Sequence, residues 1–355
     1  MNPSTTPQDS SAVEPRSGVT FRSLLTGAIM AFCISTGAPY GNMVLRGSYL
    51  ALDFSTAGAI FLFFLLVLIV HTGLGLADRR LAFRPEELVV IYIMSIVACS
   101  IPTMGLTEYL LPIISGATYY ATTENEWGIL VHPSIPSWMV PQDFTSVKYF
   151  YEGSPRGIGI RWEAWITPLL VWIPLILGIY FSMVCLIVML RKQWIVRERL
   201  AFPLVQVPLA MVEDDDSGKA LKPFFRNWLM WCGFALPLLV GSLKALHNYY
   251  NFIPTVITQT SIPLFRNTAS LSIALSFPML GFTYLVNTDI AFSIWFFSLL
   301  MRAQEGTFGV LGLSSPEKLW YAPPEPIIAH QGMGAFFVMV LFGLWTARDH
   351  LGDVW

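Results

Sequence analysis

Long, uncharged apolar runs constrain this chain more than any other feature. A helix needs about 20 mostly apolar residues to cross the roughly 30 Å hydrocarbon core of a bilayer. Only 12% of the residues are charged, against about 25% in soluble domains. Six runs approach or exceed the required length: Leu24–Tyr40, Thr56–Leu76, Leu88–Gly105, Ala164–Leu190, Trp228–Leu243 and Ile327–Ala347. The sequence therefore predicts an all-α fold, a polytopic transmembrane helix bundle.

Two further features predict broken helices. A seventh region, Ala269–Met301, has Asp289 as its only charge, and as one straight helix it would measure roughly 50 Å, too long for a bilayer without steep tilt. We expect it to split near Val286-Asn287-Thr288-Asp289, either as one kinked crossing or as a re-entrant hairpin. The first run ends in Gly37-Ala38-Pro39-Tyr40-Gly41, whose Pro and Gly residues predict another break. The total is about seven spans.

The distribution of Lys and Arg predicts the orientation, because cytoplasmic loops carry the excess positive charge. The loop after the second run contains Arg79, Arg80 and Arg84. The loop after the fourth run contains Arg191, Lys192, Arg197, Arg199, Lys219, Lys222 and Arg226. We expect both loops and the N-terminus to face the cytoplasm.

The remaining segments divide the chain by composition. Residues 1–18, rich in Ser, Thr and Pro, predict a disordered cytoplasmic tail, and residues 19–355 form the transmembrane domain. Within it, residues 106–163 are expected to form an external cap rich in aromatic residues and Pro, as an interfacial anchor or a binding surface. Residues 191–227 are expected to form an amphipathic cytoplasmic loop.

Composition and motifs disfavour soluble enzymes and nucleic-acid binders. The net charge is -2, so no basic field attracts nucleic acid. The chain lacks GxSxG, HExxH and GxxxxGK[ST] motifs, and its four Cys and five His residues have no metal-ligand spacing. We expect no enzyme activity, cofactor or metal; an intramembrane enzyme built on two converging carboxylates is the alternative.

Polar residues at membrane depth are the informative candidates, because they are costly unless they face a cavity or a partner. Asp289 is the strongest, with Asn287 and Thr288 beside it near the expected break. Carboxylate, hydroxyl and free backbone groups at a half-helix end can hold a proton, a sodium ion or a cationic substrate. The alternative is that Asp289 caps the second half-helix.

The end of the first run supplies a second set of candidates. Tyr40 and Asn42 lie in the expected break, and Arg46 follows as a partner for an anionic group. An ordinary external turn is the alternative. Glu108 is either intramembrane or interfacial. The predicted substrate- or ion-binding residues are thus Asp289, Asn287, Thr288, Tyr40, Asn42, Arg46 and Glu108.

Three motifs resemble an uncharacterised family of bacterial polytopic membrane proteins that is distantly similar to the oligopeptide transporter family. They begin at Phe21 (Phe-Arg-Ser-Leu-Leu-Thr-Gly-Ala), at Arg197 (Arg-Glu-Arg-Leu-Ala-Phe-Pro) and at Gly281 (Gly-Phe-Thr-Tyr-Leu-Val-Asn-Thr-Asp-Ile-Ala-Phe-Ser). In the oligopeptide transporters a Gly typically follows the Phe-Pro pair, whereas Leu204 and Val205 stand here. Proteins of both kinds are considerably longer, so the resemblance implies that this chain is the N-terminal portion of a longer transporter.

These observations lead to one hypothesis and one rival. The hypothesis is a secondary transporter of a peptide-like or other small organic solute, coupled to protons or sodium. The rival is a non-transporting membrane scaffold or assembly subunit that binds a partner through the external cap. The expected partners are the lipid bilayer and a small-molecule solute, without nucleic acid; a homo-oligomer and a missing C-terminal half stay open.

Overall fold

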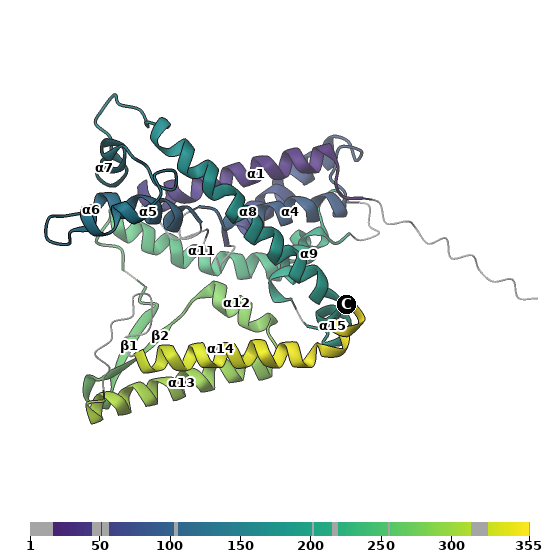
Figure 1. Cartoon of the computed structure of the whole chain (residues 1–355). Helices are drawn as coiled ribbons and strands as arrows, with labels where there is room; N and C mark the ends of the chain where they lie inside the picture. Colours follow the sequence, from purple (N-terminus) through teal and green to yellow (C-terminus); the bar gives the residue numbers. More distant parts are fainter. Residues whose placement is uncertain are drawn as a thin grey trace, which may run out of the picture. The chain divides into compact units, whose positions relative to one another are not determined.

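The computed structural model describes residues 17–44, 51, 57–102, 106–200, 202–214, 219–254, 256–313 and 326–354 (Figure 1). The chain divides into two compact units. The first unit comprises Met1–Gly128 and Val205–Trp231, and the second comprises Ile129–Leu204 and Cys232–Trp355. The expected cap (106–163) and cytoplasmic loop (191–227) are each shared between the two units. Most of the predicted tail lies outside the described residues.

Helices build the described part of the first unit. They are α1 (Phe21–Pro39), η1 (Tyr40–Val44), α2 (Ala57–Leu65), η2 (Leu66–His71), α3 (Thr72–Ala77), α4 (Pro85–Cys99), α5 (Leu106–Tyr119), most of α9 (Pro203–Val212) and α10 (Pro223–Arg226). η1 and η2 are π-helical. Two helices, α6 (Trp127–Leu130) and α11 (Trp228–Tyr249), begin in this unit and end in the other.

α1 and α4 pack along each other in parallel, and this pair forms the centre of the first unit. α1 begins at a Thr20 cap, whose side chain accepts a hydrogen bond from the backbone N–H of Ser23. The buried face of α1 recurs every three or four residues: Ser23, Gly27, Met30, Ile34 and Ala38. A side chain at Gly27 would collide with Met94 of α4, so glycine permits the close approach. At the far end Ala38 packs in one cluster with Cys99.

The α2–η2–α3 rod runs back beside this pair. Phe63 contacts Tyr92 of α4 with ring centroids 5.0 Å apart, and Phe64 contacts Phe225 of α10 at 5.1 Å. A methyl group on Gly75 would lie 3.2 Å from the Cβ of Ala220, so α3 closely approaches the segment before α10. Two Lys/Arg-rich segments, the turn after α3 and the segment around Lys222, therefore share one end of this unit.

The described part of the second unit contains long helices and one hairpin. Its helices are η3 (His132–Ser134), α7 (Phe144–Glu152), α8 (Glu163–Lys192), η4 (Gln193–Arg197), η5 (Phe265–Asn267), α12 (Phe277–Leu285), α13 (Thr288–Leu311), α14 (Pro326–Thr346) and α15 (Arg348–Val354). The antiparallel strands β1 (Gln259–Leu264) and β2 (Ala269–Ala274) pair from Gln259–Ala274 to Leu264–Ala269. α13 contacts β2 and η5.

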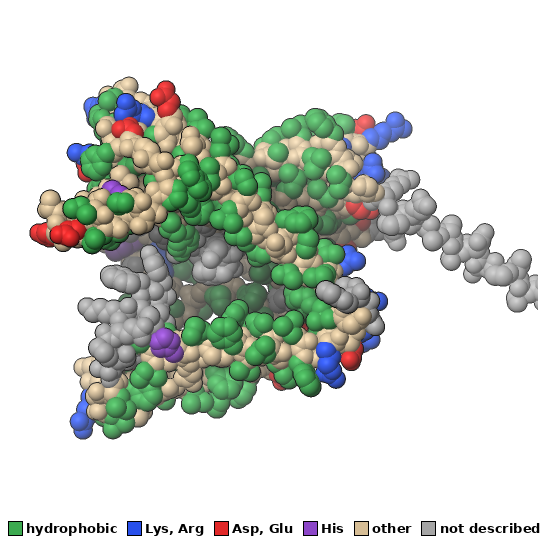
Figure 2. Space-filling model, in the orientation of Figure 1, with side chains coloured by type: hydrophobic (Ala, Val, Ile, Leu, Met, Phe, Trp, Pro, Cys, Tyr) green, Lys and Arg blue, Asp and Glu red, His purple; other side chains and the backbone are tan. Residues whose placement is uncertain are grey.

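Among the described residues, five helical segments are long and apolar enough to cross a membrane: Phe21–Val44, Ala57–Ala77, Glu163–Arg197, Trp228–His247 and Pro326–Thr346. They correspond to five of the six predicted runs. Hydrophobic side chains dominate the surface of α8 and α14 (Figure 2), as expected of surfaces that lipid or other apolar partners cover. The all-α class is confirmed, and the total of about seven spans stays a prediction.

Three local expectations differ from the structure. Within the run Leu88–Gly105, of which residues 103–105 lie outside the described residues, helix α4 ends at Cys99, because Pro102 follows closely and disfavours helix before it. The first helix does not break at Pro39; it continues into η1, since the wider π-helical turn accommodates a residue without an N–H. Residues 269–274 form strand β2 rather than helix, because they pair with β1.

Candidate functional site

The strongest predicted residues lie at a real break between two helices. α12 ends at Leu285, Val286 has an extended backbone (φ -84°, ψ 147°), and α13 begins at Thr288. The Asn287 side chain accepts a hydrogen bond of 3.0 Å from the backbone N–H of Asp289. The predicted split near Val286–Asp289 is therefore confirmed. Asn287, Thr288 and Asp289 share the first turn of α13.

Asp289 does not cap α13, contrary to one of the two readings of the sequence. Asn287 occupies the capping position, and its β-region-like backbone lets the side-chain oxygen reach the second N–H of the helix. The Asp289 side chain is exposed, and within the described ranges its carboxylate has no hydrogen bond or ion pair. Its backbone carbonyl accepts a hydrogen bond from Ser293. The Asp289 carboxylate is thus free for another partner at the positive end of a helix.

The second predicted set lies at the end of α1. Tyr40 and Asn42 are in η1, where Tyr40 is 56% exposed. Both polar side-chain atoms of Asn42 are buried, and neither has a hydrogen-bond partner in the described part of the chain. Buried amides normally have hydrogen-bond partners, so the Asn42 amide is available to bind a ligand or an ion. Arg46 lies outside the described residues.

Glu108 occupies the first turn of α5 and is partly buried. The backbone N–H of Leu106 donates to the carbonyl of Ser100 just after α4, which ties the start of α5 to that end of α4. Because α1 and α4 are parallel, Glu108 lies at the same end of the first unit as Tyr40 and Asn42. The residues around Asp289 belong to the second unit, and their pairing with the Tyr40–Asn42 region stays a prediction.

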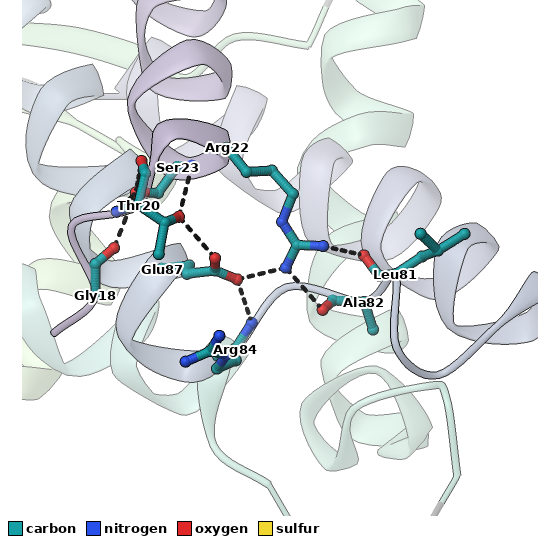
Figure 3. A network of polar contacts seen from close by, with 8 residues as sticks. All are labelled: Gly18, Thr20, Arg22, Ser23, Leu81, Ala82, Arg84 and Glu87. Atoms are coloured by element: carbon teal, nitrogen blue, oxygen red, sulfur yellow. Dashed lines mark hydrogen bonds and ion pairs between the residues drawn. The ribbon is translucent and has the colours of Figure 1, made fainter. Parts of the chain in front are cut away.

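The opposite end of the first unit contains a dense polar network, drawn in Figure 3. Arg22 donates to the Glu87 carboxylate at 2.5 Å and to the carbonyls of Leu81 and Ala82 at 2.8 and 3.1 Å. Thr20 donates to the same carboxylate at 2.7 Å. The network joins the start of α1 to the turn before α4.

Glu87 is the electrostatic centre of that network, because its side chain is only 3% exposed. Burial raises the pKa of the Glu87 carboxyl, but the hydrogen bonds it accepts from Arg22 and from the Arg84 backbone N–H outweigh burial. The net result is a pKa below the ordinary value of 4.5. Glu87 is therefore held ionised, which suits a structural ion pair.

Two buried polar residues, His71 and Lys222, are not among the predicted binding residues. His71 is 5% exposed at the end of η2, and its Nδ1 is buried without a hydrogen-bond partner in the described ranges. Lys222 is 3% exposed and donates to the Val212 carbonyl at 3.1 Å and to Asp214 at 2.6 Å. His71 could have been noticed in the sequence, because it is a polar residue in an apolar run. No sequence pattern indicates the burial of Lys222, because it depends on the contact between α3 and the segment before α10.

A cavity of about 430 Å³ lies in the second unit, where part of the predicted cap meets the start of α8. Trp172 of α8 donates to the Met139 carbonyl at 3.0 Å, and Trp165 contacts Phe150 of α7 with ring centroids 5.3 Å apart. These contacts hold the cap segment against α8. The residues that line the cavity are Ser137, Val140, Gln142, Asp143, Ser146, Arg161, Glu163, Ala164, Thr167 and Pro168.

One ion pair shapes this cavity. Asp143 caps α7 by accepting from the backbone N–H groups of Thr145 and Ser146, and Arg161 donates to it at 2.6 Å. The Ser146 hydroxyl lowers the pKa of the Asp143 carboxyl most. Burial is the next-largest effect and raises the pKa, but the backbone N–H groups and Arg161 also lower it, so the pKa lies below its ordinary value. These contacts hold the segment before α8 in place, and that segment is helical only in part.

The apolar helices and the charges confined to their ends define a helical membrane protein. The chain belongs to the family of unknown function DUF6785, whose sequence profile matches residues 13–355. Comparisons with curated proteins and with solved structures found no match. Membership of a family of unknown function agrees with the uncharacterised family expected from the motifs, whereas the likeness to oligopeptide transporters rests on the sequence motifs alone.

Proposed function

We propose that the protein is a secondary transporter of a small, peptide-like organic solute, coupled to protons or sodium, in the bacterial cytoplasmic membrane. The observation that carries this proposal is the interrupted helix α12–α13, with an exposed Asp289 carboxylate in its first turn. Transporters build solute and ion sites from such half-helix ends. A carboxylate in an apolar region is costly unless it has such a role.

Further observations agree with this function. Asn42, a buried amide without a partner in the described residues, and the π-helical η1 place a second irregular polar segment at the end of a candidate span, and π-helical turns are frequent at functional sites. The two Lys/Arg-rich segments share one end of the first unit, which favours a common cytoplasmic side together with the N-terminus.

The test is uptake into proteoliposomes. We expect labelled glycylglycine, or labelled amino acids, to accumulate under an imposed proton or sodium gradient. Asp289→Asn should abolish gradient-driven accumulation, because the neutral amide cannot exchange a proton or balance a cation. Asp349→Asn, which alters an exposed carboxylate of α15, is the matched control and should transport normally. Unchanged accumulation by Asp289→Asn would remove this carboxylate from the mechanism.

The rival scaffold function is favoured by a different observation. The cap segment that precedes α8 presents exposed aromatic side chains, among them Trp138, Phe144 and Trp162, and aromatic residues are enriched in protein interfaces. A scaffold would co-purify stoichiometrically with a membrane partner, and Trp138→Ala would release that partner. The transporter would show flux in its absence.

A further inference from the structure

The cavity beside α8 lies at the start of a candidate membrane span, Glu163–Arg197. Its position is therefore the boundary between the bilayer and water, whichever side of the membrane the cap occupies. Its volume of about 430 Å³ falls in the range of small-molecule sites. The contacts of Trp172 and Trp165 fix its walls before any ligand arrives.

Three charged side chains line the cavity, and two of them can still form hydrogen bonds or ion pairs with a ligand. Asp143 is committed to the α7 cap and to Arg161. Glu163 has no hydrogen bond or ion pair among the described residues, and the side chain of Arg161 uses only Nη1, on Asp143. The positive ends of α7 and α8 offset part of the acidic charge. The cavity thus keeps an acidic formal charge, with the Glu163 carboxylate and the remaining N–H donors of Arg161 available to a ligand.

The rest of the lining selects the kind of ammonium group. Ser137, Gln142 and Thr167 offer oxygen acceptors, whereas none of the lining residues that the structure describes is aromatic. Quaternary ammonium groups are recognised by aromatic cages, and a trimethylammonium has no N–H to donate. A primary ammonium, with three N–H donors, matches these oxygens.

We propose that this cavity binds a small zwitterion, with its primary ammonium on Glu163 and its carboxylate or phosphate on Arg161. Two sources carry this chemistry: a free amino-acid-like solute and the headgroup of an aminophospholipid in the adjoining leaflet. This proposal is independent of the proposed transport function, because its test measures binding and not transport.

The experiment compares ligands that differ only in N-methylation. For the solute source, isothermal titration of the full chain in detergent uses γ-aminobutyrate and γ-butyrobetaine, its trimethylated counterpart. For the lipid source, native mass spectrometry counts phosphatidylethanolamine and phosphatidylcholine retained from equimolar nanodiscs. Each arm is repeated with Glu163→Gln, with Arg161→Gln and with the control Glu124→Gln, an exposed acid that does not line the cavity. Circular dichroism verifies that each variant is folded.

We expect the primary ammonium to be preferred in one arm, which then identifies the source. Glu163→Gln should weaken that binding about tenfold or more, because a hydrogen bond to a charged group is lost, and Arg161→Gln should weaken it as well. Glu124→Gln should bind as the native chain does. The proposal is overturned by equal binding of the methylated and unmethylated ligands, by undiminished binding to folded Glu163→Gln, or by no binding in either arm.

Discussion

Arg22 and Glu87 are 65 positions apart in the chain, yet their side chains form a 2.5 Å ion pair. The pair joins the first turns of two parallel helices, α1 and α4 (Figure 3). Glu87 is almost fully buried, whereas Arg22 is 38% exposed. The pair contributes to stability because Glu87 is buried, and an ionised carboxylate without a partner is costly in a buried site.

Arg22→Gln should therefore destabilise the first unit. We expect a loss of about 1–3 kcal/mol in the free energy of unfolding, reduced from the cost for a fully buried pair because Arg22 is partly in water. Thermal unfolding in detergent, followed by circular dichroism, measures it. Arg80→Gln, in the exposed turn after α3, is the control. Equal melting temperatures for Arg22→Gln and Arg80→Gln would contradict a stabilising pair.

The depressed pKa of Glu87 predicts a pH dependence with a definite sign. The pKa is lower in the folded protein than its ordinary value of 4.5, so the unfolded chain binds the proton more readily. The stabilisation is then complete above about pH 5 and decreases as the pH falls below 4.5 through the folded pKa. Melting temperatures between pH 7 and pH 3.5 should fall more steeply for the native chain than for Glu87→Gln. Parallel curves would show that Glu87 has no such linkage.

Gly27 sets the distance between α1 and α4. A larger side chain there would collide with Met94, and overpacking typically costs about 1–3 kcal/mol. We expect Gly27→Leu to lower the melting temperature and Gly37→Leu, on the same helix, to have little effect, because no atom of the described residues lies within 4 Å of a Cβ at Gly37. Helix propensity favours Leu over Gly at both positions, so similar losses for the two variants would contradict a specific packing role for Gly27.

The roles of Asn287 and Asp289 can be separated. Asn287→Ala removes the α13 cap and should cost about 1 kcal/mol locally, seen as faster hydrogen exchange in the first turn of α13. Asp289→Asn keeps the cap, because the bond to Asn287 uses the backbone N–H of residue 289, and exchange should stay as in the native chain. Fast exchange in both variants would assign Asp289 a structural role.

Much of the helical architecture could be predicted from composition and spacing. Apolar runs without charge predicted five helices of membrane length, since a run of that length has no other stable form in a bilayer. The polar group Asn287-Thr288-Asp289 predicted the break before α13, because Asn and Asp favour helix starts. The prediction was wrong where a segment could form either a helix or a strand. The residues of strand β2 are apolar enough for a helix, but they pair with β1 instead.

The candidate site was predictable only in part. Asp289 and Asn42 were found because polar residues are conspicuous in apolar surroundings, whereas the cavity beside α8 was not, because Arg161, Asp143 and Glu163 lie in an ordinary polar stretch. Their grouping required α7 to fold back on the start of α8. The burial of Lys222 and of Glu87 was also not predictable. From the sequence, Glu87 would be expected to be an exposed acid in a charged turn.

The sequence by itself determined that this is a helical membrane protein, where its long helices lie, and that one of them is interrupted before Asp289. These properties depend on residues close together in the chain, where hydrophobicity and capping act locally. Only the tertiary structure decided that α1 and α4 run parallel, that Arg22 neutralises Glu87, and that a cavity forms beside α8. Those properties depend on contacts between distant segments, whose geometry follows from the packing of side chains such as Gly27 against Met94 and not from any local pattern.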